Sequence, residues 1–409
     1  MDETDTVEYK QFQIYGVKFM FKALTFPASL SILSIFLSST SFADNFQIGD
    51  SSSELGSISV SGWLRANYQD KSYASNDKKL KFDAAKINLD YNAKYFFGNI
   101  EYRCYQFDKI CDFSSIVNAN LGYKINQNQS IRLGIQDMPF GPSRSWSTSW
   151  YGGVLVNTGL EDVHNLGINY HYQYTDTGKL DIGYFLRDAG NYTGKSLDSA
   201  HYSANFIKSS STNSPSVKEK NMWVTRVDQK LPLSNIPNLD ISLGASYWYS
   251  ELENHNNGNI GHRNTWAAFS RLNYNGIHFT LTGGKNRVNN QDSLYPNYTL
   301  VGSFDTPYYV ANRGNFYTAD VNYTFKNIFK HYNLTPYASY TIYDKNNNGD
   351  QSSTRNILGM QLDINQFSVA TEYIIGKNDT FIGGNEYSWA TGTSHKSEDL
   401  LNILFLYNF

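Results

Sequence analysis

The stretch "SISVSGWLRANY", from Ser57 to Tyr68, alternates between two kinds of side chain. Its even-numbered positions are apolar, aromatic or glycine, whereas the odd-numbered ones include Ser59, Ser61 and Arg65. A period of two residues places the two sets on opposite faces of a β-strand. The stretch therefore predicts a strand with one apolar and one polar face.

The same pattern recurs along the chain with turn signals between the copies. We predict about 16 such strands, an even number typical of outer-membrane barrels. They span residues 57–69, 79–93, 95–106, 112–125, 128–138, 164–174, 179–188, 221–231, 238–251, 263–274, 276–287, 315–325, 334–344, 354–365, 366–377 and 397–409.

Short and long connections alternate between these strands. The long, polar ones include 189–220, 288–314 and 378–396, and all of the short ones fall on the opposite side. This segregation is typical of outer-membrane barrels, whereas a soluble β-sandwich has no reason for it. Because every backbone polar group must be paired in a bilayer, such a sheet must close. The predicted fold class is all-β, a transmembrane antiparallel up-and-down β-barrel.

The composition excludes several other classes. The 409 residues include 32 Tyr and 25 Phe, and the mean hydropathy is -0.48. This chain is too polar for a helical membrane protein and too aromatic for a disordered one. No apolar run of about 18 residues follows residue 43, and the near-neutral net charge of -3 gives no support to a nucleic-acid role.

The N-terminus is predicted to be a secretory signal peptide preceded by a short extension. Lys22 precedes an apolar stretch, and the segment ends on Ser41-Phe42-Ala43, a small-x-small cleavage pattern. We expect cleavage after Ala43, with Met20 as the natural start. Residues 44–56 are then a short periplasmic segment and 57–409 a single transmembrane barrel in the Gram-negative outer membrane.

Parity assigns the charged face of the strands to the barrel lumen, since Arg or Lys facing lipid costs about 2–4 kcal/mol at the bilayer midplane. A barrel of this strand number retains an aqueous channel. As a set, the basic residues are candidates to coordinate anions; alternatively, they are only the solvated side of the wall. The predicted pore-lining basic residues are Arg65, Lys86, Arg103, Lys124, Arg132, Arg226, Arg271 and Arg355.

The connection from Pro139 to Asn165 is unusually rich in aromatic and aliphatic residues for a solvent-exposed loop. We expect this third extracellular loop to fold into the barrel and constrict the pore, where its acids would face wall arginines. Two alternatives are an ordinary packed loop at a subunit interface, and aromatic residues that stack on sugar rings. The predicted constriction residues are Arg144, Trp146, Trp150, Tyr151, Glu161 and Asp162.

Cys104 and Cys111 are the only cysteines, and they form either a local disulfide or two inert thiols. The eight histidines are scattered, and no G-x-S-x-G, H-E-x-x-H or phosphate-loop motif is present. The sequence therefore predicts no catalytic residues, no metal site and no cofactor.

The chain ends on "LLNILFLYNF", from Leu400 to Phe409. Phe405, Tyr407 and Phe409 share the lipid face of a final strand that closes against the first one. An aromatic last residue on such a strand resembles the signal recognised by the outer-membrane assembly machinery.

These features together resemble a Gram-negative porin. "IRLGIQDMPFG", from Ile131 to Gly141, resembles the junction of strand five and loop three in porins related to the phosphate-selective family. The resemblance implies a homotrimer in outer-membrane lipid, with passive diffusion of small hydrophilic solutes and ions. A substrate-specific channel for anions such as phosphate, or for sugars, is the second hypothesis, although the predicted lumen holds as many acids as bases. A barrel enzyme or adhesin is the third.

Overall fold

The computed structural model describes residues 46–409 apart from 75–77, 210, 212, 234–235, 329–330 and 393–395. The chain divides into two units, Met1–Phe42 and Ala43–Phe409. Of the first unit only β1 (Gln13–Ile14) and β2 (Val17–Lys18) are described, and they pair antiparallel. The predicted signal peptide and its cleavage after Ala43 otherwise fall outside the described residues, and so does the start at Met20.

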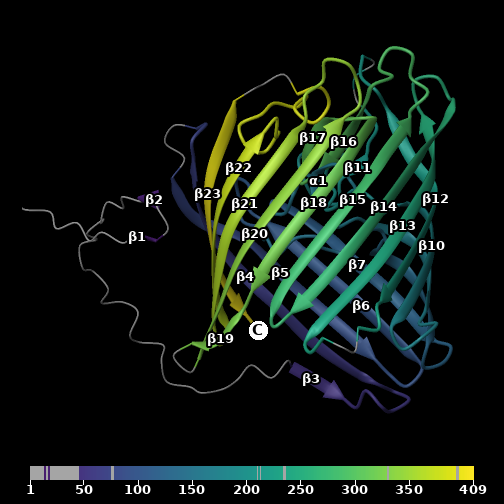
Figure 1. The fold of residues 1–409 in the computed structure, drawn as a ribbon. Coiled ribbons are helices and arrows are strands. Elements are labelled where there is room, and N and C mark those ends of the chain that lie inside the picture. Colours follow the sequence, from purple (N-terminus) through teal and green to yellow (C-terminus); the bar gives the residue numbers. More distant parts are fainter. Residues whose placement is uncertain are drawn as a thin grey trace, which may run out of the picture. The chain divides into compact units, whose positions relative to one another are not determined.

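In the second unit, 16 long antiparallel strands of the described residues close into a barrel (Figure 1). The prediction of fold class and strand number is confirmed. The strands are β4 (Ser57–Lys71), β5 (Lys79–Asn92), β6 (Phe96–Tyr105), β7 (Phe113–Lys124), β8 (Gln129–Asp137), β9 (His164–Tyr172), β10 (Gly178–Asp188), β12 (Val217–Lys230), β13 (Leu239–Asn254), β14 (Ile260–Tyr274), β15 (Ile277–Asn289), β18 (Arg313–Tyr323), β20 (Tyr332–Lys345), β21 (Ser353–Ile364), β22 (Phe367–Lys377) and β23 (Ser397–Asn408).

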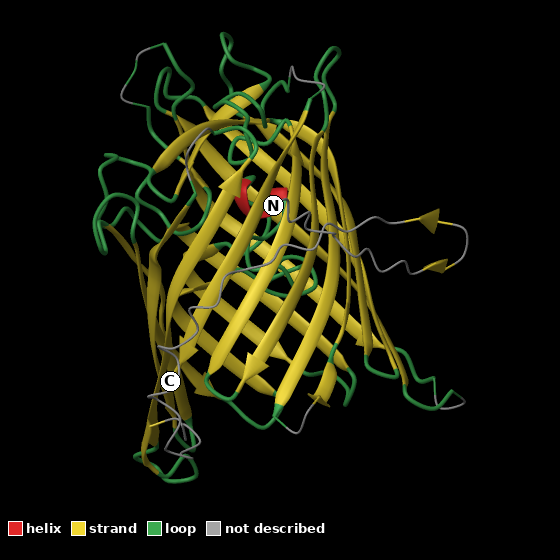
Figure 2. Cartoon of the chain, turned by 90° about the vertical axis from the view of Figure 1, so that its left-hand side faces the viewer, coloured by secondary structure: helices red, strands yellow, loops and turns green. Residues whose placement is uncertain are grey.

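Tight turns join the strands at one end of the barrel and long loops join them at the other (Figure 2). The hairpin between β14 and β15 turns on Asn275 (φ 49°) and Gly276 (φ 86°). Two consecutive positive φ angles fit a type I′ turn, whose twist matches that of the flanking strands. The long loops are named here by number: L3 (138–163), L4 (189–216), L6 (290–312) and L8 (378–396).

The strands alternate as their sequence predicts on the outer face. In β13, Leu243, Tyr247 and Tyr249 are 36–47% exposed and point outward. Between them the inner face carries Trp248 and, further on, Leu252, both buried. The expectation of a uniformly polar inner face is therefore wrong near the long loops, because inner residues there pack against loops rather than water.

Several shorter elements were not predicted. β11 (Asn205–Phe206) from L4 pairs with β16 (Tyr298–Ser303), which pairs with β17 (Thr306–Ala311), both from L6. β3 (Phe46–Gly49) pairs with the start of β4, and β19 (Phe325–Ile328) continues β18 after a break. The single helix of the described residues is α1 (Val154–Asn157) in L3, and no described helix is long and apolar enough to cross a membrane.

The two ends of the sheet meet where β23 pairs with β4. Phe409 N–H donates to Gly62 O at 3.1 Å, and Gly62 N–H donates to Phe409 O at 2.9 Å. A Cβ on Gly62 would lie 2.2 Å from Lys86 O and 2.6 Å from the Phe409 ring, so only glycine fits. The last residue therefore completes the closure and leaves no open edge there.

Candidate functional site: the inner wall and loop L3

L3 begins at the end of β8 and is attached to strands on the far side of the barrel. Thr148 donates from its N–H and Oγ1 to Asp320 of β18, at 2.9 and 2.7 Å. Ser149 Oγ and Trp150 N–H both donate to Glu372 Oε1 of β22, at 2.7 and 2.8 Å. Inner-face carboxylates thus satisfy backbone donors that an irregular segment would otherwise leave unpaired.

The helical turn of L3 is held by Arg355 of β21. Its Nη1 donates to Gly152 O at 2.9 Å and Gly153 O at 3.2 Å. Its Nε and Nη2 donate to both carboxylate oxygens of Asp379 in L8, at 2.7 and 2.9 Å, and both side chains are fully buried. Arg355 therefore joins L3, L8 and the wall, and α1 lies within the outline of the barrel in both views (Figures 1 and 2).

The two legs of L3 meet near β6. Arg144 donates to Asp162 at 2.6 Å and to Glu101 of β6 at 2.9 Å. Burial alone would raise the pKa of Asp162, but the Arg144 guanidinium and a hydrogen bond from His164 hold it well below its usual range. The carboxylate of Asp162 in this cluster is therefore ionised beside Arg144 at neutral pH.

Glu161 lies beside this cluster but differs from Asp162 in its protonation. Its side chain is 3% exposed, Oε1 accepts from Trp146 N–H at 2.6 Å, and Oε2 has no hydrogen-bond partner among the residues that the structure describes. Burial raises the pKa of Glu161 to about 8, against the hydrogen bond from Trp146, and the nearby carboxylates of Asp162 and Asp320 add to the rise. Glu161 is therefore mostly protonated at neutral pH.

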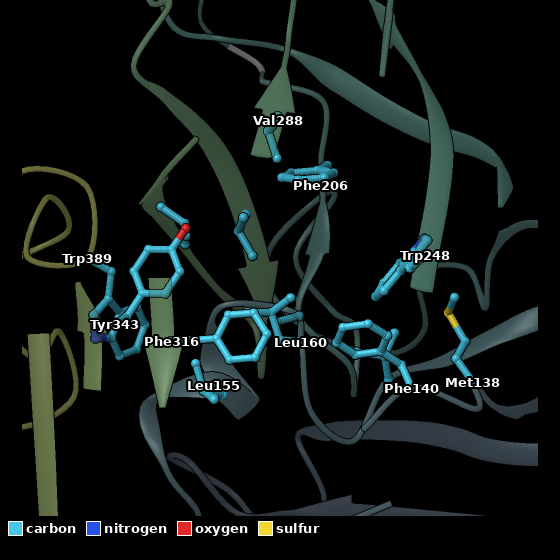
Figure 3. Close-up of a cluster of buried hydrophobic side chains, with 14 of the residues drawn as sticks. Met138, Phe140, Leu155, Leu160, Phe206, Trp248, Val288, Phe316, Tyr343 and Trp389 are labelled. Atoms are coloured by element: carbon cyan, nitrogen blue, oxygen red, sulfur yellow. The ribbon is translucent and has the colours of Figure 1, made fainter. Parts of the chain in front are cut away.

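Four loops share one hydrophobic cluster with the upper wall (Figure 3). Phe140 of L3 lies edge-on to Trp248 of β13, with ring centroids 5.8 Å apart. Tyr308 of L6 contacts Trp389 of L8 at 4.8 Å. Trp146 is 2% exposed at the same cluster. Burial of this apolar surface fixes the loops against one another without any membrane contribution.

The other half of the inner wall, from β4 to β14, holds five partly exposed arginines in pairs with carboxylates. Arg226 donates to Asp181 at 2.8 Å and Arg132 to Asp137 at 3.2 Å, and these arginine side chains remain 21% and 32% exposed. The other partly exposed pairs are Arg65 with Asp83, Arg103 with Glu101, and Arg271 with Asp228, whereas Arg263 of β14 and Glu219 of β12 form a buried pair at 3.5 Å. The five partly exposed arginine–carboxylate pairs are called the charged arc below.

The other predicted residues are placed as follows. Lys86 has no ion pair among the described residues, whereas Lys124 donates to Asn92 Oδ1 and Ala93 O at the short-turn end. Tyr151 packs under Arg355, with the guanidinium carbon 5.0 Å from the ring centroid. Cys104 and Cys111 are joined in a disulfide, with Cα atoms 4.8 Å apart. No group of three metal-binding side chains occurs in the described part of the chain.

Sequence reasoning missed the contribution of the other loops. Tyr202 of L4 donates to Asp162 at 2.5 Å and lies against Arg103, whose guanidinium carbon is 4.9 Å from its ring centroid. Phe206, Tyr308 and Trp389 pack in the same region. The aromatic richness that singled out L3 also occurs in L4, L6 and L8, and it would have indicated that they too are packed.

Comparison with solved structures identifies the architecture. OmpT, an outer-membrane protein of Vibrio cholerae, is 15% identical, with 90% of this chain and all of that chain covered and a TM-score of 0.53. The outer-membrane channel DcaP of Acinetobacter baumannii is 13% identical, with 88% and 99% covered and a TM-score of 0.55. The fold is that of a Gram-negative outer-membrane porin.

An anion-selective porin from Comamonas acidovorans has the same porin fold at 11% identity, with 86% of this chain and 99% of that chain covered and a TM-score of 0.51. No protein-family model matches the sequence. No curated protein matches it either. The porin likeness thus lies in the architecture, and the chemistry of the lumen must be taken from this chain's own residues.

Proposed function

We propose that the protein is an outer-membrane porin, a water-filled channel for passive diffusion of small hydrophilic solutes and ions. The observation that carries the proposal is a closed barrel of 16 strands with apolar side chains outward and partly exposed ion pairs inward. At this strand number side chains alone do not fill the interior. The apolar outer surface is stable in contact with lipid, and the partly exposed ion pairs of the charged arc are stable in contact with water.

The solute path runs between L3 and the charged arc. L3 covers the inner face of β18–β22, where Asp320, Glu372 and Arg355 are occupied by its backbone and side chains. Across from it, Arg132 and Arg226 keep 32% and 21% of their side chains exposed, and Arg271, which keeps 34%, also donates to Pro142 O of L3 at 3.1 Å. In this proposal L3 is the constriction, and the charged arc is the surface past which solutes move.

The channel discriminates weakly between anions and cations. Each arginine of the charged arc has a carboxylate within 3.2 Å, so the fields of the two charges largely cancel for a passing ion. The alternative, a channel specific for anions, is supported by Lys86, which has no carboxylate partner among the described residues, and by the anion-selective relative in fold. Block by inorganic phosphate at micromolar concentration would favour the alternative.

We propose that the working unit is a homotrimer, as OmpT of Vibrio cholerae is in its trimer form. The assembly signal is the aromatic set Phe405, Tyr407 and Phe409, whose last member pairs with Gly62. Deletion of Phe409 removes the final pairing and should reduce heat-sensitive oligomer on denaturing gels before it changes single-channel conductance. Wild-type oligomer levels in the deletion variant would contradict the assembly role.

The N-terminal prediction remains part of the proposal. The mature chain would begin at Asp44, with residues 44–56 in the periplasm and 57–409 as one barrel. Mass measurement of the chain isolated from outer membranes tests this directly. A chain that retains residues 1–43 would overturn it.

Liposome swelling tests the channel function. Vesicles that contain the folded protein should swell in isotonic solutions of small sugars, with a rate that falls steeply as sugar size increases. A single sugar that enters far faster than others of equal size would favour the sugar-specific alternative. Absence of swelling with every solute, from protein whose gel migration shows a folded barrel, would overturn the proposal.

A further inference from the structure

Three cations lie together on the outer face of the barrel, at its long-loop end. The outward positions of β15 run from Ile277 through Phe279, Leu281 and Gly283, and then change abruptly to Lys285 and Arg287. Arg313, the first residue of β18, is also exposed. Lys285, Arg287 and Arg313 are called the outer basic patch.

The patch places two positive charges next to each other, and no described acidic side chain forms an ion pair with either of them. Arg287 and Arg313 lie directly opposite each other in the register of β15 and β18. Like charges in such a cross-strand position destabilise a sheet. Among the described residues, none of the three side chains of the patch makes an ion pair or a hydrogen bond.

The neighbouring outward residues do not compensate for this charge. Asn264 lies opposite Arg287 on the other side, and Asn315 lies opposite Lys285. The nearest carboxylate by register is Asp344, opposite Asn315, and it already accepts a hydrogen bond from the hydroxyl of Ser352. The patch therefore presents net positive charge to whatever surrounds the barrel.

The position of the outer basic patch along β15 places it at the level of a membrane–water interface. Arg287 lies ten residues beyond Ile277, about 34 Å along the strand, which at a strand tilt of about 40° is about 26 Å of height and matches the lipid-facing band of about 25 Å in such barrels. Trp266, opposite Lys285, and Tyr317, opposite Gly283, are 50% and 53% exposed. Exposed Trp and Tyr mark the headgroup level, so the cations lie among headgroups.

We infer that the outer basic patch binds the phosphate groups of anionic lipid headgroups in the leaflet on the long-loop side. Two arginines side by side offer paired N–H donors that match phosphate oxygens, and binding an anion between them relieves their repulsion. The patch lies on a convex wall rather than in a pocket, which favours a phosphate held in the membrane plane over free phosphate. The inference rests on the proposed membrane placement but not on conduction.

The test compares two double variants of the full chain in detergent. Arg287→Gln with Arg313→Gln removes two cations of the patch. Lys94→Gln with Lys326→Gln is the matched control, because it removes two exposed cations at the short-turn end. Diphosphorylated lipid A and phosphatidylcholine are titrated in turn, and bound lipid is counted by native mass spectrometry.

The wild-type protein and the control should bind lipid A in preference to phosphatidylcholine, and the arginine variant should bind it about tenfold or more weakly, since each interfacial cation contributes about 1 kcal/mol. Unchanged binding in the arginine variant would overturn the inference, and so would competition by millimolar inorganic phosphate. If the arginine variant loses the oligomer and no added lipid restores it, the inference is overturned and the patch is instead a contact between copies of the chain. Swelling of vesicles by the same variant, measured in parallel, separates failure of this inference from failure of the channel proposal.

Discussion

The two halves of the inner wall use the same residue types in different ways. On β18–β22, Asp320, Arg355 and Glu372 are occupied by L3 and L8, and the Arg355–Asp379 pair is fully buried. On the charged arc, each arginine pairs with a carboxylate of the wall and keeps 13–34% of its side chain exposed, although Arg271 also contacts L3 and Arg103 also contacts L4. From this comparison we expect a charge on the inner face to stabilise the fold where a loop covers it, and to act on passing solutes where water reaches it.

The largest effect is expected from breaking the buried pair. Arg355→Met leaves the carboxylate of Asp379 buried without its counter-charge, with one hydrogen bond from Phe381 N–H, which should lower the free energy of unfolding by about 3–5 kcal/mol. Urea unfolding in micelles, followed by tryptophan fluorescence, measures it. Arg132→Met on the charged arc is the control and should cost about 1 kcal/mol or less, because both side chains of its pair are about one third exposed to water. Equal losses in the two variants would remove the distinction between the halves.

The second-largest effect is expected when L3 is released from the wall. Glu372→Ala removes the acceptor of Ser149 and Trp150, and the unpaired donors should lower stability by about 1–3 kcal/mol and raise single-channel conductance. Asp363→Ala is the matched control, since Asp363 accepts only from Gln361 and Ser368 in the described structure. Conductance raised equally by both would show that L3 is not the constriction.

The pH dependence of stability tests Glu161. Its pKa is about 4.5 in an unfolded chain and about 8 in the folded one, so the folded state holds a proton that the unfolded state has lost. Stability from this group is fully present below pH 4.5 and is lost as the pH rises to about 8. Glu161→Gln should flatten the fall in stability between these values, measured as melting temperature against pH. An unchanged slope would mean that Glu161 is ionised in the packed loop.

The smallest effect is expected on the charged arc. Arg226→Gln should move the reversal potential in a salt gradient toward cation preference by about twofold or less in permeability ratio, because Asp181 already offsets much of its field. Asp181→Asn should shift it in the opposite direction. A much larger shift would indicate an anion-specific channel.

The strands could be predicted from the sequence because their pattern is local, whereas the loop contacts could not because they join distant residues. In β13 and β15 the alternation of side chains is imposed locally, by lipid on one side, and it can be counted from sequence. The partners of Arg355 come from L3 and L8, about 200 and 24 residues away, and no local pattern encodes them. Arg355 was therefore predicted to line the pore, whereas the structure buries it.

The same reasoning explains the inner apolar residues. Phe316 and Tyr343 stand at inner positions that parity assigns to water, but L3, L6 and L8 cover them. Their aromatic character was visible in the sequence, but the loop residues that they pack against come from distant parts of the chain. The pairing of the first and last strands was easier to predict from sequence, because closure of the barrel must bring the strands of Gly62 and Phe409 together.

The most direct test of the central claim is conductance of the purified protein in a planar bilayer with a salt gradient. We predict discrete conductance steps, with a small reversal potential that reflects the paired charges of the charged arc. A folded protein that produces no steps at any voltage would contradict the account of the barrel as an open, water-filled channel.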